Sequence, residues 1–246
     1  MKITLSECIG EQMKIELFGD DIGAVEYVSH MGTDLSVVNA ARVSFGTERE
    51  EVSERDIKLI NYLMAHNHSS PFEHCVLTFK FTVPLFIRSQ HHRHRTWAYN
   101  EISRRYTSID MKFYSPSDFR TQHESNRQAS NDSLINPLLN SSYSSNGFEH
   151  ASNAVTNHNA QSLNLYNALV DSGVCREQAR GVLSQNLYTQ YFGTVNLHNL
   201  LKFISLRSHE GAQWEIQQVA KACLQIAKQY FPHSVKAYTS KHEVEL

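Results

Sequence analysis

The feature that most constrains this chain is a basic stretch of 17 residues, from Gln90 to Tyr106. It contains four arginines and three histidines but only one carboxylate, Glu101. Such a concentration of positive charge calls for an anionic ligand, and a guanidinium group matches phosphate through paired charge-assisted hydrogen bonds. Gln90 and Arg93 are three residues apart, so they would share one face of a helix. We therefore interpret the stretch as a helix end that runs into a loop, with both parts facing one ligand.

The second half of the stretch has an alternating pattern. Glu101, Ser103 and Arg105 occur at every second position, so an extended segment would place them on one face. Two other interpretations remain open: a solvated basic surface, or a patch that binds nucleic acid, which arginines interleaved with aromatic residues would suit. The whole chain has a net charge of -2. This argues against nucleic acid as the main ligand, because domains that bind it are usually basic.

The composition is typical of a soluble globular protein, with 41% hydrophobic residues. The 246 residues suffice for one large domain or two small ones, and we predict a single domain over residues 1–246. No apolar run approaches the ~18 residues of a membrane span, and residues 1–10 lack the pattern of a signal peptide. The cysteines form no CxxC pair, which favours reduced thiols in a cytoplasmic protein. They are Cys8, Cys75, Cys175 and Cys223.

The apolar pattern of the first half predicts both strands and helices. Thr33 and Ser53 are suited to cap helices, and Pro84 is suited to open one. The expected elements are strands over residues 13–17, 24–28 and 76–83 and helices over residues 35–45, after Ser53 and after Pro84. Three histidines at residues 66–74 would stand in a loop, because Pro71 stops the preceding helix. We predict no metal there, because catalytic zinc sites usually pair histidines at helical spacing with a carboxylate.

The second half begins with a polar segment. Twelve of the 23 residues from 125 to 147 are serine or asparagine, which predicts a flexible loop because such a composition buries little apolar surface. The expected elements after it are helices over residues 151–172, 176–180, 197–206 and 210–231 and a strand over residues 187–195, with the helix at 210–231 the longest amphipathic one. This order favours a mixed α/β fold of the α+β type, a mostly antiparallel sheet flanked by long helices.

The order of residues in the basic stretch resembles the signature of the flavin-dependent thymidylate synthases. The matching residues are Arg93-His94-Arg95, Asn100-Glu101, Ser103 and Arg105-Tyr106. A Ser-Pro-Phe-Glu-His run at residues 70–74 is also similar to the family, as are the glutamate and arginine at 177 and 180. The resemblance extends over about residues 13–240. It implies the fold of that family, with the α+β character expected above.

The resemblance implies an enzyme that methylates dUMP at C5 to give dTMP. Methylenetetrahydrofolate would supply the carbon, and FAD reduced by NADPH would supply the hydride. No cysteine has a neighbouring proline, the context in which the other thymidylate synthase class presents its nucleophile, and no G-x-G-x-x-G motif is present for a Rossmann flavin site. The alternative is a flavin- or nucleic-acid-binding protein of the same fold without catalysis.

The resemblance also assigns ligand contacts. Flavin would be bound by His68, Ser70, Arg93, His94, Arg95, Thr96, Glu101, Asn196, Leu197, His198 and Lys202. The nucleotide would be bound by Gln90, His91, His92, Arg93, Glu101, Ile102, Ser103, Arg104, Arg105, Arg180 and Arg207. The family often has asparagine or histidine at the position of Lys202 and histidine at that of Gly211. A homotetramer with shared active sites is implied, so mixing the inactive variants Arg93→Ala and Arg207→Ala should restore activity.

Arg207 is the candidate catalytic residue by its family position. C5 of the pyrimidine becomes nucleophilic when negative charge on N3 and its flanking oxygens is stabilised, and a fixed guanidinium does this electrostatically. The alternative is a helix C-terminal arginine that binds carbonyl groups. We expect Ser103 to hydrogen-bond the nucleotide rather than attack it, because its arginine neighbours cannot accept its proton. Glu177 and Arg180 could simply pair with each other.

Overall fold

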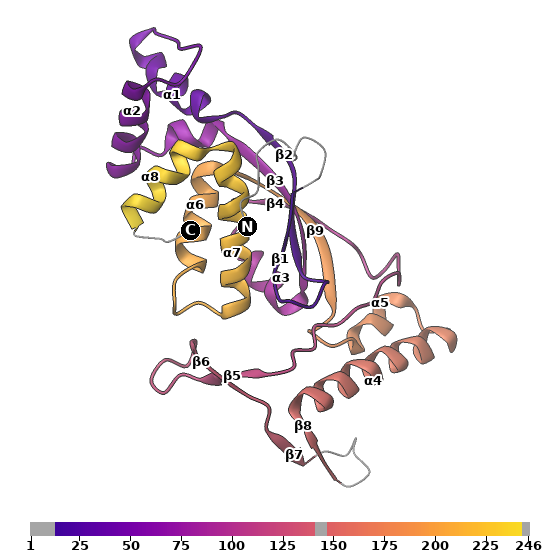
Figure 1. The fold of residues 1–246 in the computed structure, drawn as a ribbon. Helices are drawn as coiled ribbons and strands as arrows, with labels where there is room; N and C mark the ends of the chain where they lie inside the picture. The colour runs from indigo at the N-terminus through magenta and orange to yellow at the C-terminus, as the bar shows by residue number, and fades with distance from the viewer. Residues whose placement is uncertain (1–12, 141–146, 243–246) are drawn as a thin grey trace.

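The computed structural model describes residues 13–140 and 147–242. Its centre is a five-stranded sheet in the order β1-β2-β3-β9-β4 (Figure 1). The strands are β1 (Lys14–Glu16), β2 (Ala24–Met31), β3 (Val76–Pro84), β9 (Tyr188–Asn196) and β4 (Ala98–Glu101). Every neighbouring pair is antiparallel. The predicted mixed α/β fold with a mostly antiparallel sheet is therefore confirmed.

The core lies on one face of the two central strands. β3 and β9 pair along their whole length, from Val76 opposite Asn196 to Pro84 opposite Tyr188. Because side chains alternate between the faces of a strand, Leu77, Phe79 and Phe81 all point to the same side, and all three are fully buried. The alternation read from the sequence thus identified the buried face.

The helices pack against that face and beyond its ends. They are α1 (Asp34–Arg42), α2 (Glu54–Ala65), α3 (Leu85–His91), α4 (Ala151–Asp171), α5 (Arg176–Ala179), α6 (Leu197–Arg207), α7 (Trp214–Tyr230) and α8 (Pro232–His242), with short 3-10 helices η1 (Val43–Phe45), η2 (Ser70–His74) and η3 (Arg180–Val182). In Figure 1, α6, α7 and α8 lie together on one side of the sheet. Ile216, Val219 and Cys223 of α7 join the same hydrophobic cluster as the β3 aromatic residues. The predicted amphipathic stripe therefore faces the core.

The capping residues read from the sequence correctly predicted where several helices begin or end. The Thr33 side chain accepts a hydrogen bond at the start of α1, and Ser53 forms a capping box with Asp56 at the start of α2. Asn196 caps α6 through the backbone N–H of Asn199. Gly173 has a φ of 89° just after α4, the left-handed conformation that ends many helices. Each of these predicted boundaries is confirmed.

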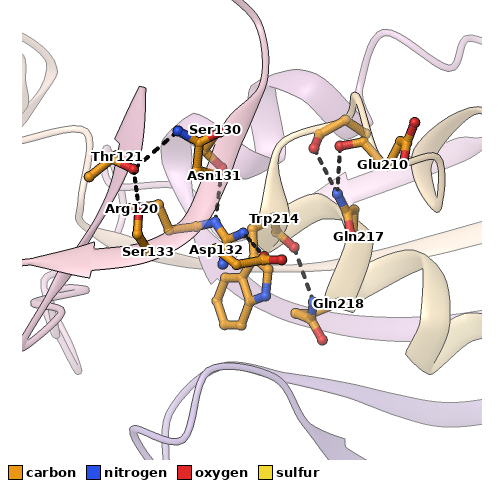
Figure 2. A network of polar contacts seen from close by, with 11 residues as sticks. Arg120, Thr121, Ser130, Asn131, Asp132, Ser133, Glu210, Trp214, Gln217 and Gln218 are labelled. Carbon is orange, nitrogen blue, oxygen red and sulfur yellow. Dashed lines mark hydrogen bonds and ion pairs between the residues drawn. The ribbon is translucent and has the colours of Figure 1, made fainter. Parts of the chain in front are cut away.

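The predicted loop at residues 125–147 is wrong over residues 130–135 and 138–140, because these belong to β-strands. Strands β5 (Phe119–Gln122) and β6 (Ser130–Ile135) pair with each other, as do β7 (Leu138–Asn140) and β8 (Phe148–His150). Polar side chains hold the first hairpin. Arg120 Nε donates to Ser130 Oγ at 2.9 Å (Figure 2). Asn131 Nδ2 donates to the Gln122 carbonyl at 3.1 Å. Residues 141–146 of the predicted loop lie outside the described residues.

Three further features differ from the sequence-based expectation. Helix α7 begins at Trp214 rather than at residue 210, and its 17 residues make it shorter than α4, which has 21. Residues 70–74 form the 3-10 helix η2 rather than an irregular loop. Helix α8 had no counterpart in the prediction. The cysteines of the described residues are free, and Cys8 lies outside them. None of the described helices is both long and apolar enough to cross a membrane.

Candidate functional site

A cavity of about 980 Å³ lies between α2, α6, α8 and the turn that follows α3. Its lining includes the cations Arg93, Arg95, Lys202 and Lys241 and the histidines His68, His94, His198 and His242. No aspartate or glutamate of the described residues lines it. The volume is at the upper end of the ~300–1,000 Å³ common for small-molecule sites. A cavity of this size with charges of one sign favours an extended anionic ligand.

The basic triplet, Arg93-His94-Arg95, lines this cavity from the turn between α3 and β4. The backbone N–H of His94 donates to the carbonyl of His91 at 2.9 Å. The Tyr99 hydroxyl lies 2.9 Å from that carbonyl and 3.1 Å from the carbonyl of His94, and its proton is shared between them. Because Tyr99 belongs to β4, which pairs with β9, the edge of the sheet holds the arginines in place.

His91 has a structural role rather than the predicted nucleotide contact. Its ring is fully buried, with centroids 4.8 Å from Phe81 and 4.5 Å from Trp97, and its Nδ1 lies 2.8 Å from the Tyr191 hydroxyl. A side chain enclosed in this way does not reach a ligand in this cavity. His92, its neighbour, packs its ring against Tyr99 with the centroids 4.1 Å apart.

The burial of His91 predicts acid sensitivity. Burial, together with the positive charge of nearby groups, holds the pKa of His91 well below 6.5. The unfolded chain binds this proton near pH 6.5 and the folded chain does not, so stability present above pH 6.5 is lost as the pH falls, by up to about 1.4 kcal/mol per pH unit. In urea titrations, His91→Gln should lose less free energy of unfolding than the wild type between pH 6.5 and 5. Equal losses would contradict the assignment.

A second cavity, of about 520 Å³, adjoins the first and shares Arg93, His94 and Leu206 with it. Arg207, at the end of α6, lines this cavity and donates from Nε to His94 Nε2 at 3.0 Å. The imidazole nitrogen must accept, so His94 is neutral with its proton on Nδ1. Burial and the charges of Arg207 and Lys202 hold the pKa of His94 at about 4. His94 therefore orients Arg207 without adding positive charge.

The Arg207 guanidinium is directed into the site rather than onto its own helix. Among the described residues, its hydrogen-bond partner is His94, and no helix carbonyl accepts from it. Burial, with the charge of Arg93, lowers the pKa of Arg207 below its usual range. The alternative of a capping arginine is thus not what the structure contains.

The downstream half of the signature lies at the far end of β4. Glu101 accepts from the Thr189 hydroxyl at 2.6 Å and pairs with Arg88 at 3.2 Å. Ser103 to Tyr106 form a turn, in which the Tyr106 N–H donates to the Ser103 carbonyl at 3.0 Å. The predicted extended face is therefore wrong beyond Glu101. The four residues of β4 span about 13 Å, so Ser103 is well separated from the basic triplet.

The alternative in which the Glu177 carboxylate pairs with Arg180 is not what the described residues show. The Glu177 carboxylate lies 3.3 Å from Arg105, and Arg180 Nε donates to the Glu177 backbone carbonyl at 3.3 Å. Ile102 and Arg104 line a third cavity of about 280 Å³. Most of the predicted nucleotide contacts of one chain are thus divided between the second cavity and the region beyond the end of β4.

Most of the predicted flavin contacts do converge. His68, Thr96 and His198 line the large cavity with the triplet and Lys202. Ser70 does not line it, but its neighbour Ser69 does. Asn196 caps α6, and Leu197 is fully buried in the core. No group of three potential metal ligands occurs within residues 13–140 and 147–242.

Sequence reasoning missed the contribution of α8. Lys241 Nζ donates to the Met64 carbonyl at 2.7 Å and to Asn67 Oδ1 at 2.6 Å, which ties α8 to the end of α2. Both Lys241 and His242 line the large cavity. The three-residue spacing of the buried side chains Val235 and Tyr238 was the available signal for this helix.

This chain is similar to known proteins over most of its length. Residues 26–233 match the family model described as thymidylate synthase complementing protein. A flavin-dependent thymidylate synthase of Thermus thermophilus is 41% identical over 218 residues, 89% of this chain and 76% of that protein. One from Thermotoga neapolitana is 40% identical over 226 residues, 92% and 94% of the two chains.

A solved structure has the same fold. The UMP/dUMP methylase PolB of Streptomyces cacaoi, bound with 5-Br dUMP, superimposes with a TM-score of 0.75 and 31% sequence identity, over 94% of this chain and 100% of that one. The complex of that protein with 5-Br UMP gives a TM-score of 0.74. The family match covers most of the sequence and nearly the full length of one relative. This chain therefore belongs to the flavin-dependent thymidylate synthase family.

Proposed function

We propose that this protein methylates C5 of dUMP to give dTMP for de novo thymidylate synthesis, with methylenetetrahydrofolate as the carbon donor. The observation that carries the proposal is the pair of adjoining cavities that share Arg93 and His94. One is large and lined by cations. The other contains Arg207, held by a neutral histidine. This arrangement suits an anionic cofactor beside a pyrimidine nucleotide.

The large cavity fits FAD by its charge and its size. Arg93, Arg95 and Lys202 would hold the pyrophosphate, and no described carboxylate lines the cavity to oppose it. His68 and His198 would contact the rings. When bound and reduced by NADPH, FAD would supply the hydride. The chain itself contributes a site that binds and orients.

Arg207 would act on the pyrimidine. Its Nε–H is engaged by His94, which leaves the two terminal NH₂ groups to donate to the nucleotide. A fixed cation there would stabilise negative charge on N3 and its flanking oxygens, so electron density rises at C5. Because His94 stays neutral around pH 7, with its pKa at about 4, this geometry persists across the physiological range.

We propose a homotetramer with shared sites. Ser103, Arg105 and Arg180 lie past the far end of β4, so they and Arg207 of one chain are poorly placed to meet one nucleotide. A second chain could bring its own Arg105 and Arg180 to the cavity of the first. We also expect one domain over residues 1–246 and a cytoplasmic location.

Ser103→Ala should still make dTMP at saturating dUMP. Ser103 Oγ accepts from the Arg105 backbone N–H at 3.3 Å, and within the described residues neither imidazole nor carboxylate hydrogen-bonds to it. A hydroxyl without a base is a weak nucleophile. We expect a dUMP KM raised about tenfold, the loss of one hydrogen bond, with kcat nearly unchanged in steady-state assays. A variant with bound flavin and full dUMP affinity but no product would overturn this role.

The proposed activity has a direct test. The purified protein should show flavin absorbance that NADPH bleaches without oxygen, and it should convert dUMP to dTMP only when methylenetetrahydrofolate is present. UMP should be assayed beside dUMP, because the structural neighbour is a methylase of both. Flavin bleaching without product from either nucleotide would favour the binding protein without catalysis.

A further inference from the structure

Four polar side chains connect the second cavity to the start of α7. Gln90, which lines the cavity, donates from Nε2 to Gln213 Oε1. Gln213 Nε2 donates to Glu215 Oε2 at 2.9 Å. The other carboxylate oxygen of Glu215 accepts from the Tyr114 hydroxyl at 3.3 Å. We infer that Gln213 and Glu215 are positioning residues that orient the Gln90 amide so that its carbonyl oxygen accepts a hydrogen bond from the nucleotide.

The direction of the chain follows from what each group can do. An ionised carboxylate only accepts, so Glu215 must receive the NH₂ group of Gln213. The Gln213 oxygen is then the atom that faces Gln90, and it must receive the Gln90 NH₂ group. This leaves the Gln90 oxygen, which has no hydrogen bond within the described part of the chain, as the acceptor. The Glu215 carboxylate, acting through Gln213, thus sets which end of the Gln90 amide faces the cavity.

The other end of the chain is anchored as well. Burial, together with the charge of Glu215, raises the pKa of Tyr114 well above 10, so the phenol keeps its proton and donates. Trp214 lies between the two positioning residues in the sequence. The Arg120 guanidinium carbon is 6.0 Å from the centroid of its ring (Figure 2). The first hairpin therefore packs on the first turn of α7 and restrains it.

An oriented acceptor has a use in this cavity. Arg93 and Arg207 only donate, and the accepting nitrogen of His94 is already occupied by Arg207. The Ser89 hydroxyl donates to the Leu85 carbonyl at 2.9 Å. A nucleotide also presents donors, at its sugar hydroxyl and its ring N–H. The Gln90 oxygen is the amide acceptor that the described lining offers to one of them.

This inference rests on the proposed function, and its test separates the two. Dissociation constants for dUMP would be measured calorimetrically on the flavin-loaded protein. In Gln213→Lys, the ammonium group pairs with Glu215 and donates to the Gln90 oxygen, which reverses the polarity. We expect the Kd to rise tenfold or more. In Glu215→Gln the side chain can donate as well as accept, so it no longer fixes the orientation of the Gln213 amide, and the Kd should rise by a smaller factor.

Double variants with Gln90→Ala distinguish an effect on the orientation of Gln90 from a general effect on the fold. In a Gln90→Ala background, neither substitution should change the Kd further, because the group that they orient is gone. Glu210→Gln removes the same charge just before α7, outside the chain of side chains, and should leave the Kd unchanged. Flavin content and Tm would be recorded for each variant.

The outcomes are decisive for one claim or the other. Wild-type protein that binds neither dUMP nor UMP would overturn the proposed function and this inference with it. Wild-type binding with an unchanged Kd in Gln213→Lys would overturn the orientation alone. Equal losses with and without the Gln90 side chain would also overturn it, since they would reveal a general effect on the fold.

Discussion

Replacing Arg207 with alanine should lower kcat by on the order of 10²–10³, the effect of removing one preorganised charge from a transition state. The guanidinium lines the second cavity and is held by the 3.0 Å hydrogen bond to His94. Its removal takes away the stabilisation of negative charge on the pyrimidine but leaves most of the lining of the large cavity in place. Single-turnover formation of dTMP at saturating dUMP would measure the loss, with flavin content as the check on folding.

Two further variants sharpen this result. Arg207→Lys keeps a positive charge but lacks the planar fork that binds His94 and the nucleotide together, so it should recover only part of the rate. Arg55→Ala removes an exposed arginine at the start of α2, away from both cavities, and should retain full activity. An Arg207→Ala enzyme with near wild-type kcat would show that the cation does not act on the reacting ring.

Mixing Arg105→Ala with Arg207→Ala should restore activity that neither variant has alone. The two side chains lie at opposite ends of β4 in one chain. If a site takes Arg207 from one subunit and Arg105 from another, a hybrid assembly contains sites in which both are intact. Random exchange of equal amounts should give about a quarter of the wild-type activity. Activity would be followed after subunit exchange by dilution and reconcentration.

The pair Arg93→Ala and Arg207→Ala, expected from the sequence to complement, is instead the matched control. Both side chains line the same cavity of the same chain. Every site of a mixed assembly would then lack one of them, so no activity should return. Recovery with this pair, or none with the first pair after exchange is demonstrated, would contradict the shared arrangement.

The regular elements were largely readable from the sequence. The alternation of Leu77, Phe79 and Phe81 predicted both the strand and its buried face, and the caps at Thr33 and Asn196 predicted where helices begin. These signals act between residues a few positions apart, so the sequence contains them directly. The strand pairs within residues 119–140 and 148–150 were missed because their stability comes from cross-strand polar contacts, such as Arg120 with Ser130, rather than from an apolar pattern.

The sequence by itself determined which residue types could form the site: a basic triplet, a serine and two arginines after it, and an arginine at the end of a later helix. Only the tertiary structure decided how they combine. His94 and Arg207 form a hydrogen bond although they are 113 positions apart in the sequence, and Gln90 and Gln213 do so at a separation of 123. Ser103 is only nine residues beyond His94 but lies past the far end of β4. Packing of the sheet and helices sets these distances, and no local pattern encodes contacts of that range. The same packing buried His91 in the core, although Gln90 and Arg93, close to it in the sequence, line the second cavity.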